Sequence, residues 1–222
     1  MASVLVFPRL SSDDLPIVIA AGFVLVILAA GTAYTLTTLG TAPLLTPNYL
    51  LTQLQTGAFL GIVACGMMTV ILLGHIDLSV PWTMTAAAMM ATTVGGPAAI
   101  PTGLVIGLLV GLFNGFGVAY LRIPSMIFTL GVDSVMRGLM VAHTGGFAPQ
   151  DTATDLMRYL AADRILGVPV AVFVWAAFSI ITAVILSRTA LGKAIYATGN
   201  REAAAYLSGI RTRWVIVGAF VI

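Results

Sequence analysis

Charged residues are scarce in this 222-residue chain: only 8% of its residues are Asp, Glu, Lys or Arg. A soluble domain carries roughly 25% charged residues, so a water-soluble globule is excluded. Hydrophobic residues make up 59% of the chain. With so few charges, the net charge of +2 says little about partners, and the position of each charge along the chain is more informative. The composition predicts an all-α, polytopic transmembrane helical bundle and gives no reason to expect a nucleic-acid partner.

Patterns for catalysis and metal binding are also missing. Cys65 is the only cysteine, so no internal disulfide can form, and we interpret it as a small packing residue in a helix. Gly192-Lys193 resembles the end of a phosphate-binding loop, but Ala194 replaces the required Ser or Thr and no glycine stands five residues before Gly192. No Ser-His-Asp set, zinc spacing or catalytic carboxylate pair is present. We expect no catalytic, metal-binding or cofactor-binding residues, no cofactor, and ATP hydrolysis only on another chain.

Apolar stretches recur along the chain and are separated by Gly, Pro, Asn or charged residues. The first has about 23 residues, enough to span a bilayer, although Ala29, Ala30 and Ala33 leave a cleavable signal as the alternative. The last covers only about 14 Å, half a bilayer core. We expect a single transmembrane domain over residues 1–222, incomplete at its C-terminus, with about six complete spans and a truncated seventh. The stretches are Ile17–Leu39, Leu50–Leu73, Val80–Val94, Pro101–Leu121, Ser125–Ala142, Leu166–Leu186 and Trp214–Ile222.

Basic residues are distributed unevenly between the polar loops. Ser187–Arg213 holds five of them, and counting back through single crossings places Arg122 and the N-terminus with Arg9 on the same side. His143–Ile165 falls on the other side and holds two. Because short loops rich in Lys and Arg stay in the cytoplasm, the pattern predicts a multi-pass membrane protein with a cytoplasmic N-terminus.

Glycine occupies every fourth position of the fourth apolar stretch, at Gly103, Gly107, Gly111 and Gly115. Residues at this spacing share one helix face, and the missing side chains let another helix approach closely in lipid. We predict a helix-packing ridge, with a narrow solute path along it as the alternative. The amide of Asn114, beside the ridge, needs a partner across a helix contact or from a solute hydroxyl.

The segment from Gly74 to Pro81 interrupts two apolar stretches and contains His75, Asp77 and Ser79. It can be a broken helix beside a water-filled path, because non-helical backbone at membrane depth needs protein or a cavity next to it. It can also be a cytoplasmic turn in which Asp77 or Ser79 caps the next helix and Pro81 lies in its first turn. No relay of titratable residues accompanies His75, which indicates a polar turn residue rather than a proton carrier.

Asp133 and Arg137 are four residues apart in the fifth apolar stretch and therefore share a helix face. An isolated charge at membrane depth is costly, and an opposite charge nearby reduces that cost. We expect an ion pair between these two residues, with the lining of a polar passage as the alternative.

The basic loop Ser187–Arg213 contains an alanine-rich stretch of high helix propensity, Arg201–Leu207. Asn200 can cap the start of a short helix there, and Gly209 can end it at the C′ position. A helix of about two turns between two spans forms a protrusion that another protein can contact. The alternative is an ordinary amphipathic linker.

Several ordered blocks resemble the permeases of ribose, xylose and arabinose-type ABC importers, which are distantly similar to branched-chain amino-acid permeases. Gly74–Val80 resembles the family's Gly-Gly-Ile-Asp-Leu-Ser-Val-Gly signature, with His75 and Pro81 in place of glycines. The resemblance covers nearly the whole chain. The further blocks are Asn114-Gly115, Leu121–Pro124, Thr129–Gly131, Arg137-Gly138, Thr144–Gly146, Gly192, Tyr196-Ala197, Gly199-Asn200, the alanine run and Ser208–Ile210.

The resemblance implies a permease subunit, itself not an enzyme, that moves a sugar or sugar-like solute from a periplasmic solute-binding protein into the cytoplasm. A second permease subunit, identical or different, would share with it the lipid bilayer of a bacterial cytoplasmic (inner) membrane. A cytoplasmic ABC ATPase would dock on the loop 187–213, the coupling loop, through Gly199, Asn200, Arg201, Glu202, Ala203, Ala204, Ser208 and Gly209. Candidates for the solute path or a broken helix are Asp77, Ser79, Asn114, Asp133 and Arg137.

Three alternatives to this function stay open. A proton-coupled secondary transporter would use Asp77 or Asp133 as its proton site. A branched-chain amino-acid ABC permease would share the architecture but carry a different solute. A non-transporting membrane scaffold would form complexes without solute flux.

Overall fold

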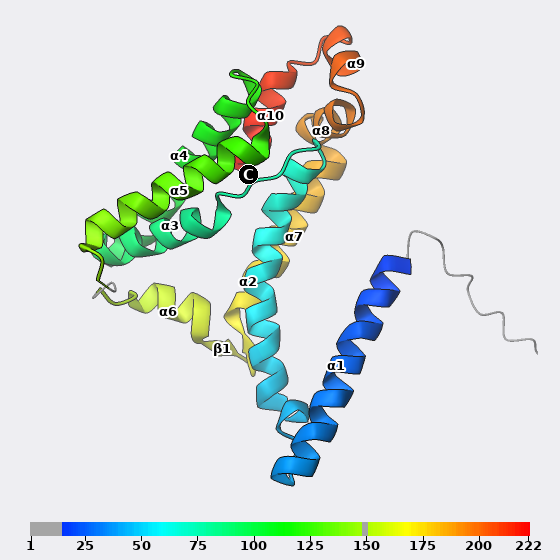
Figure 1. Ribbon diagram of the computed structural model, residues 1–222, viewed down its shortest axis with the longest axis vertical. Helices are drawn as coiled ribbons and strands as arrows, with labels where there is room; N and C mark the ends of the chain where they lie inside the picture. Colours follow the sequence, from blue (N-terminus) through cyan, green and yellow to red (C-terminus); the bar gives the residue numbers. More distant parts are fainter. Residues whose placement is uncertain (1–14, 148–150) are drawn as a thin grey trace, which may run out of the picture. The chain divides into compact units, whose positions relative to one another are not determined.

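The computed structural model describes residues 15–147 and 151–222, and these are almost entirely helical (Figure 1). Arg9, which contributed to the predicted orientation, lies outside the described residues. The chain forms two compact units, residues 1–54 and 55–222, and each is considered by itself. The prediction of helices as the dominant structure is confirmed.

The first unit contains α1 (Leu15–Leu39), the 3-10 helix η1 (Pro43–Leu45) and the beginning of α2 (Pro47–Ile71). Nearly all side chains of α1 are exposed, as expected for an apolar helix whose surroundings are lipid. Gly31 faces Leu44, and a Cβ atom at Gly31 would lie 2.7 Å from Leu44 Cδ1. The turn at η1 therefore folds back onto α1.

The second unit contains the rest of α2 and all later elements. In Figure 1, α4 lies beside α3, α5 and α10. α2 contacts α7, where Gly61 lies against the Trp175 ring. Cys65 on α2 is within 3.5 Å of the Ser179 hydroxyl on α7, which agrees with its predicted packing role. The elements are α3 (Val80–Val94), η2 (Gly96–Ala98), α4 (Ala99–Ala119), α5 (Ser125–Thr144), α6 (Asp155–Ala162), β1 (Arg164–Ile165), β2 (Val168–Pro169), α7 (Val170–Arg188), α8 (Ala190–Asn200), α9 (Glu202–Leu207) and α10 (Thr212–Val221).

Five helices among the described residues are long and apolar enough to cross a membrane. They are α1, α2, the combined η2–α4 helix, α5 and α7. α3 has 15 residues and α10 has 10. At about 1.5 Å per residue α3 is about 22 Å long, shorter than the hydrocarbon core of roughly 30 Å. Length and composition therefore account for five of the six predicted complete spans.

The predicted stretch Leu166–Leu186 is not one helix, because its first residues form a β-hairpin. β1 and β2 pair antiparallel, and Leu166 and Gly167 at the turn have φ values of 51° and 83°. Two successive positive φ angles are typical of a two-residue hairpin turn. Because Leu166 is apolar, the sequence did not indicate this turn. In the structure the Leu166 side chain is 99% exposed.

The glycine ridge of α4 contacts two different helices. A Cβ atom at Gly103 would lie 3.5 Å from the Ala87 carbonyl oxygen on α3. One at Gly115 would lie 2.7 Å from Val217 Cα on α10, and Gly111 is packed even more tightly against the α10 backbone. A Cβ atom at Gly107 would meet nothing within 4 Å, so the ridge faces open space at its middle.

We expect Gly115→Ala to lower the stability of the folded chain by about 1–3 kcal/mol, because the added methyl group overpacks the α4–α10 contact. Gly107→Ala is the matched control on the same ridge, and it should leave stability unchanged or raise it slightly through helix propensity. The midpoint of thermal unfolding in mild detergent measures both effects. Equal midpoints for the two variants would contradict the packing described here.

Candidate functional site

The chain between α2 and α3 leaves the helical conformation, with a turn at residues 72–74 followed by an irregular segment at 75–79, and α5 accepts hydrogen bonds from part of its backbone. Side chains at every fourth position of α5 accept backbone N–H groups from this connecting segment and from the first turn of α3. Buried backbone donors without partners are costly in lipid, so the α5 side chains permit the helix to be broken there. The three bonds are Ile76 N–H to Ser125 Oγ (3.2 Å), Leu78 N–H to Thr129 Oγ1 (2.9 Å) and Trp82 N–H to Asp133 Oδ1 (3.3 Å).

Asp133 and Arg137 do not form the expected ion pair. The Asp133 carboxylate instead accepts the Trp82 N–H in the first turn of α3, where donors lack intrahelical partners and negative charge is favoured. The Arg137 guanidinium carbon lies 5.8 Å from the centroid of the Trp82 ring, a cation–π distance. Both charged side chains therefore turn from each other towards α3.

Asp77, Ser79 and Asn114 form one buried polar cluster between the connecting segment and α4. Asp77 Oδ1 accepts the backbone N–H of Ser79 at 2.8 Å and its hydroxyl at 2.7 Å. Asn114 Nδ2 donates to Ser79 Oγ at 2.7 Å and lies 3.4 Å from both Asp77 carboxylate oxygens. Ser79 and Asn114 are each 1% exposed. The Asn114 amide nitrogen thus has its partners across a helix contact, whereas its buried Oδ1 has no hydrogen-bond partner among the described residues.

The predicted side-chain cap of α3 is only partly correct. Ser79 does occupy the N-cap position and Pro81 lies in the first turn, as predicted. The Ser79 side chain makes no cap hydrogen bond, because its hydroxyl donates to Asp77 and accepts from Asn114. The carboxylate that caps α3 comes from α5, through Asp133.

His75 is a half-buried residue of the connecting segment, with its ring 6.2 Å from the Phe220 ring. Burial lowers the pKa of His75, the nearby Glu202 carboxylate opposes that shift, and Arg122 adds to it. A lowered pKa keeps the imidazole neutral near pH 7, in keeping with a polar turn residue. Since the unfolded chain then binds the proton more readily, this group destabilises the fold as the pH falls through its ordinary pKa.

A cavity of about 330 Å³ lies between α2, α3, α4 and α10. Asp77, Ser79 and Thr83 supply polar groups to its lining, and Gly107 leaves space on the α4 side. The rest of the lining is mainly apolar, with Ile, Val, Leu, Met and Phe side chains. The cavity can therefore admit a small solute and offer hydroxyl and carboxylate oxygens along one wall.

The coupling loop is folded onto the core of the second unit. Ile195 of α8 is fully buried in the main hydrophobic cluster, together with Val70, Leu73 and Val215. Gly199 lies directly against the Leu72 carbonyl oxygen, where no side chain could fit. α8 is therefore attached to the end of α2 by backbone contact.

The predicted helix in the coupling loop is present as α9, but Asn200 does not cap it. Asn200 is the last residue of α8, and Arg201 holds the N-cap position of α9 without a side-chain cap bond. Gly209 ends α9 at C′ as predicted, with φ of 84° and its N–H donating to Tyr206 O at 3.0 Å. Ser208 Oγ donates to Ala204 O at 2.9 Å, which also closes this end.

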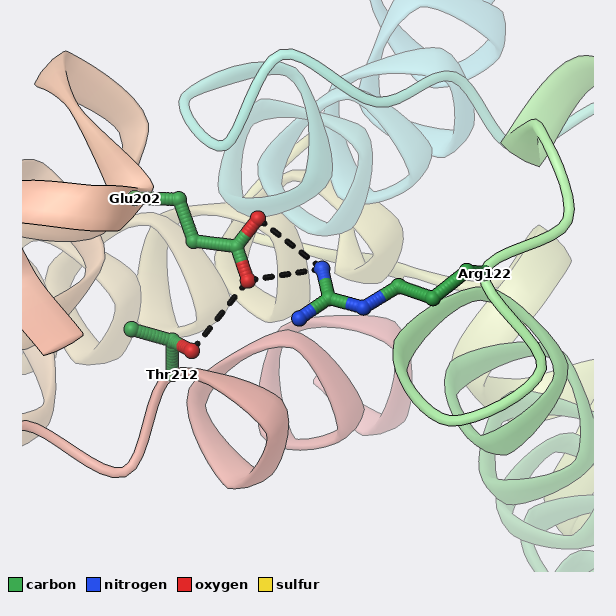
Figure 2. Close-up of polar contacts among 3 residues, drawn as sticks. All are labelled: Arg122, Glu202 and Thr212. Atoms are coloured by element: carbon green, nitrogen blue, oxygen red, sulfur yellow. Dashed lines mark hydrogen bonds and ion pairs between the residues drawn. The ribbon is translucent and has the colours of Figure 1, made fainter.

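α9 is tied to two other elements through Glu202, as Figure 2 shows. Arg122 Nη1 donates to both Glu202 carboxylate oxygens, at 2.8 and 3.0 Å, and the Thr212 hydroxyl donates to Oε1 at 3.2 Å. Arg122 lies between α4 and α5, and Thr212 begins α10. We call these three residues the clasp. Because Arg122 and Glu202 are 80 residues apart in the sequence, no local sequence pattern indicated their pairing.

These features define a class of protein: a multi-pass α-helical membrane protein with a cavity between its helices. Its loop 187–213 is folded and is bonded through Glu202 to the α4–α5 turn and to the start of α10. Residues 49–222 match the family described as "Branched-chain amino acid transport system / permease component". The chain belongs to this family of transport permeases, which is not an enzyme family. The family resemblance inferred from the sequence blocks is thereby confirmed.

Relatives of known name agree with this assignment. The autoinducer 2 import system permease protein LsrC of Salmonella typhimurium (strain LT2) is 33% identical over 186 residues, 79% of this chain and 53% of that protein. The protein of the same name from Escherichia coli O9:H4 (strain HS) is 34% identical over 176 residues, 77% of this chain and 51% of that protein. The chain thus spans about half the length of these relatives. No solved structure matches it.

We expect Thr129→Val to destabilise the folded chain by about 1–3 kcal/mol, because the isosteric valine leaves the Leu78 N–H without an acceptor. Thr144→Val is the matched control on α5, since the Thr144 hydroxyl donates only to carbonyls of its own helix. Thermal unfolding in mild detergent compares the two variants. Similar midpoints would mean that α5 does not hold the connecting segment.

Proposed function

We propose that this chain is the permease subunit of an ATP-binding-cassette importer that moves a sugar-like solute into the cytoplasm. The observation that carries the proposal is the attachment of the coupling loop to the helices around the cavity, through Gly199 and through the clasp. A loop attached in this way can pass a displacement at its surface to the walls of a cavity. The named relatives are permeases of autoinducer 2 import systems, which is consistent with a sugar-like solute here.

The partners in this proposal are an ABC ATPase, a periplasmic solute-binding protein and a second permease subunit. The ATPase would contact the exposed side of the coupling loop, where Ala203 and Ala204 are exposed on α9. ATP-driven closure would then move α9 and, through the clasp, the turn between α4 and α5. The contact of Gly199 with Leu72 would carry the same displacement to α2.

The proposed orientation places the coupling loop and Arg122 in the cytoplasm, because basic loops favour that side. The N-terminus would also be cytoplasmic, and the membrane would be a bacterial inner membrane. α3, together with residues 77–79 directly before it, would form the sixth crossing within a single permease domain. This extra crossing is what places the N-terminus on the same side as the turn between α4 and α5.

The cavity favours a neutral polyhydroxylated solute over an amino acid. Asp77 is the only charged residue in its described lining, and its oxygens and those of Ser79 suit solute hydroxyl groups. A zwitterionic amino acid also needs a positive partner for its carboxylate, and the described lining contains no Lys or Arg. The branched-chain amino-acid alternative is therefore less well supported than the sugar-like one.

The proton-coupled alternative is also less well supported by these contacts. Asp77 accepts two hydrogen bonds from Ser79, and Asp133 accepts one from the Trp82 N–H. Both carboxylates have evident structural roles.

Uptake by the assembled transporter in native membrane vesicles tests the proposed function. We expect saturable uptake of a radiolabelled sugar-like solute, with ribose and autoinducer 2 as the first probes, that requires ATP and survives a protonophore. Leucine uptake under the same conditions would favour the amino-acid permease. Uptake that collapses with the proton gradient would overturn the ATP-driven account, and stable assembly without any flux would indicate the scaffold.

Removing the clasp should uncouple ATP hydrolysis from transport. We expect Glu202→Gln to reduce transport-coupled ATPase stimulation about tenfold while leaving the chain inserted, because the charge-assisted bonds to Arg122 are lost. The exchange of charges in Arg122→Glu with Glu202→Arg should restore part of the stimulation. Arg158→Gln is the control and should have no effect, because it removes an exposed ion pair with Asp155 that, unlike the exposed pair of the clasp, lies within a single helix. Unchanged stimulation in Glu202→Gln would remove the clasp from the mechanism.

The end of α9 gives a second test of coupling. Gly209→Pro should leave insertion intact but abolish ATPase stimulation, because proline fixes φ near −65° and lacks the N–H that Gly209 donates to Tyr206. Gly209→Asn is the matched control, since asparagine tolerates the left-handed conformation. ATPase assays on reconstituted complexes compare the two variants, and full stimulation in the proline variant would contradict this role for α9.

A further inference from the structure

A second pocket, of about 640 Å³, lies on the other side of the clasp, between α9, the start of α10 and the end of α4. It is open to the surroundings and contains three arginines and one glutamate. The proposed transport mechanism uses only Arg122 and Glu202 from this set. Its lining residues are Tyr120, Arg122, Glu202, Ala203, Tyr206, Arg211, Thr212, Arg213 and Trp214.

The pocket has excess positive charge at a fixed position. Arg122 is paired with Glu202, whereas Arg211 and Arg213 form no ion pair within the described part of the chain. The Arg213 guanidinium carbon lies 5.3 Å from the centroid of the Tyr120 ring. Stacking of this kind holds the guanidinium plane while its N–H groups remain available at the edge. Arg213 is thus held ready to donate to an anion.

Aromatic residues pack near Arg213 and indicate the depth at which the pocket would lie in a membrane. Tyr120 stacks on Phe116 with ring centroids 4.7 Å apart and meets the edge of Trp214 at 6.2 Å. Tyr120 directly follows α4, and Trp214 lies in the first turn of α10 and is 61% exposed. Tyr and Trp at the ends of apolar helices lie at the level of lipid headgroups. The residues at this opening are therefore of the kind that favours the headgroup level of a bilayer.

We propose that this pocket, the headgroup pocket, binds the phosphate of an anionic glycerophospholipid. Arg211 and Arg213 would donate to the phosphate oxygens, as guanidinium groups suit this geometry, and Trp214 and Tyr206 would contact the glycerol and the first methylene groups. Basic pockets between the ends of membrane helices are favourable sites for anionic headgroups. A bound lipid would touch α9 and α10 together, so the local lipid composition would bear on the coupling loop.

Native mass spectrometry of the purified chain with added phosphatidylglycerol tests this site without any transport assay. We expect Arg211→Gln combined with Arg213→Gln to weaken phosphatidylglycerol binding about 30-fold. Lys193→Gln combined with Arg201→Gln is the matched control, because both residues are exposed in the same loop, carry the same charge and lie outside the pocket lining. The control should bind as the unchanged chain does.

Three results would overturn the proposal. Equal losses in the two double variants would mean diffuse charge attraction and no built site. Displacement of the lipid by millimolar glycerol 3-phosphate would identify a site for soluble phosphate esters. Unchanged lipid binding with loss of the co-purifying ATPase in Arg211→Gln, Arg213→Gln would identify a protein-docking surface. Because lipid binding is measured on the isolated chain, these outcomes are separate from a failure of the proposed transport function.

Discussion

The structure of the second unit depends on how the backbone between α2 and α3 is satisfied. In lipid a free N–H group is expensive, so a chain that leaves the helical conformation must find acceptors elsewhere. Ser125, Thr129 and Asp133 provide them from a single face of α5. Without that face the connecting segment could not keep its non-helical path beside α4, and Asp77 and Ser79 could not reach the cavity that α4 leaves open at Gly107.

The same end of the unit contains both the core and the coupling loop. α8 contributes the fully buried Ile195 to the hydrophobic cluster, and Glu202 joins α9 to the α4–α5 turn and to α10. The loop is therefore a structural part of the bundle and not an appendage on it. This construction explains how a surface contact with a partner could alter a cavity whose lining lies on other helices.

The sequence predicted features that depend on neighbouring residues in the chain. The long apolar helices, Pro81 in a first turn and Gly209 at a helix end follow from hydropathy and local backbone rules. The sequence-based prediction failed where a tertiary partner competed with a local one. Asp133 bonds to α3 in place of Arg137, and the Ser79 hydroxyl bonds to Asp77 and Asn114 in place of capping its helix. The pairing of Arg122 with Glu202 had no local signal, although both lay in blocks that resemble the family.

We propose that α9 and the turn between α4 and α5 move as one body when ATP binds to the partner ATPase. Spin labels at Leu207 and Met126, both exposed, would report their separation in the assembled transporter after Cys65→Ser removes the native thiol. We expect the same distance distribution by pulsed electron paramagnetic resonance without nucleotide and with bound ATP, while labels at Ile62 and Leu104 across the cavity change their separation. A distance between Leu207 and Met126 that changes with ATP, while the cavity pair stays fixed, would contradict this motion.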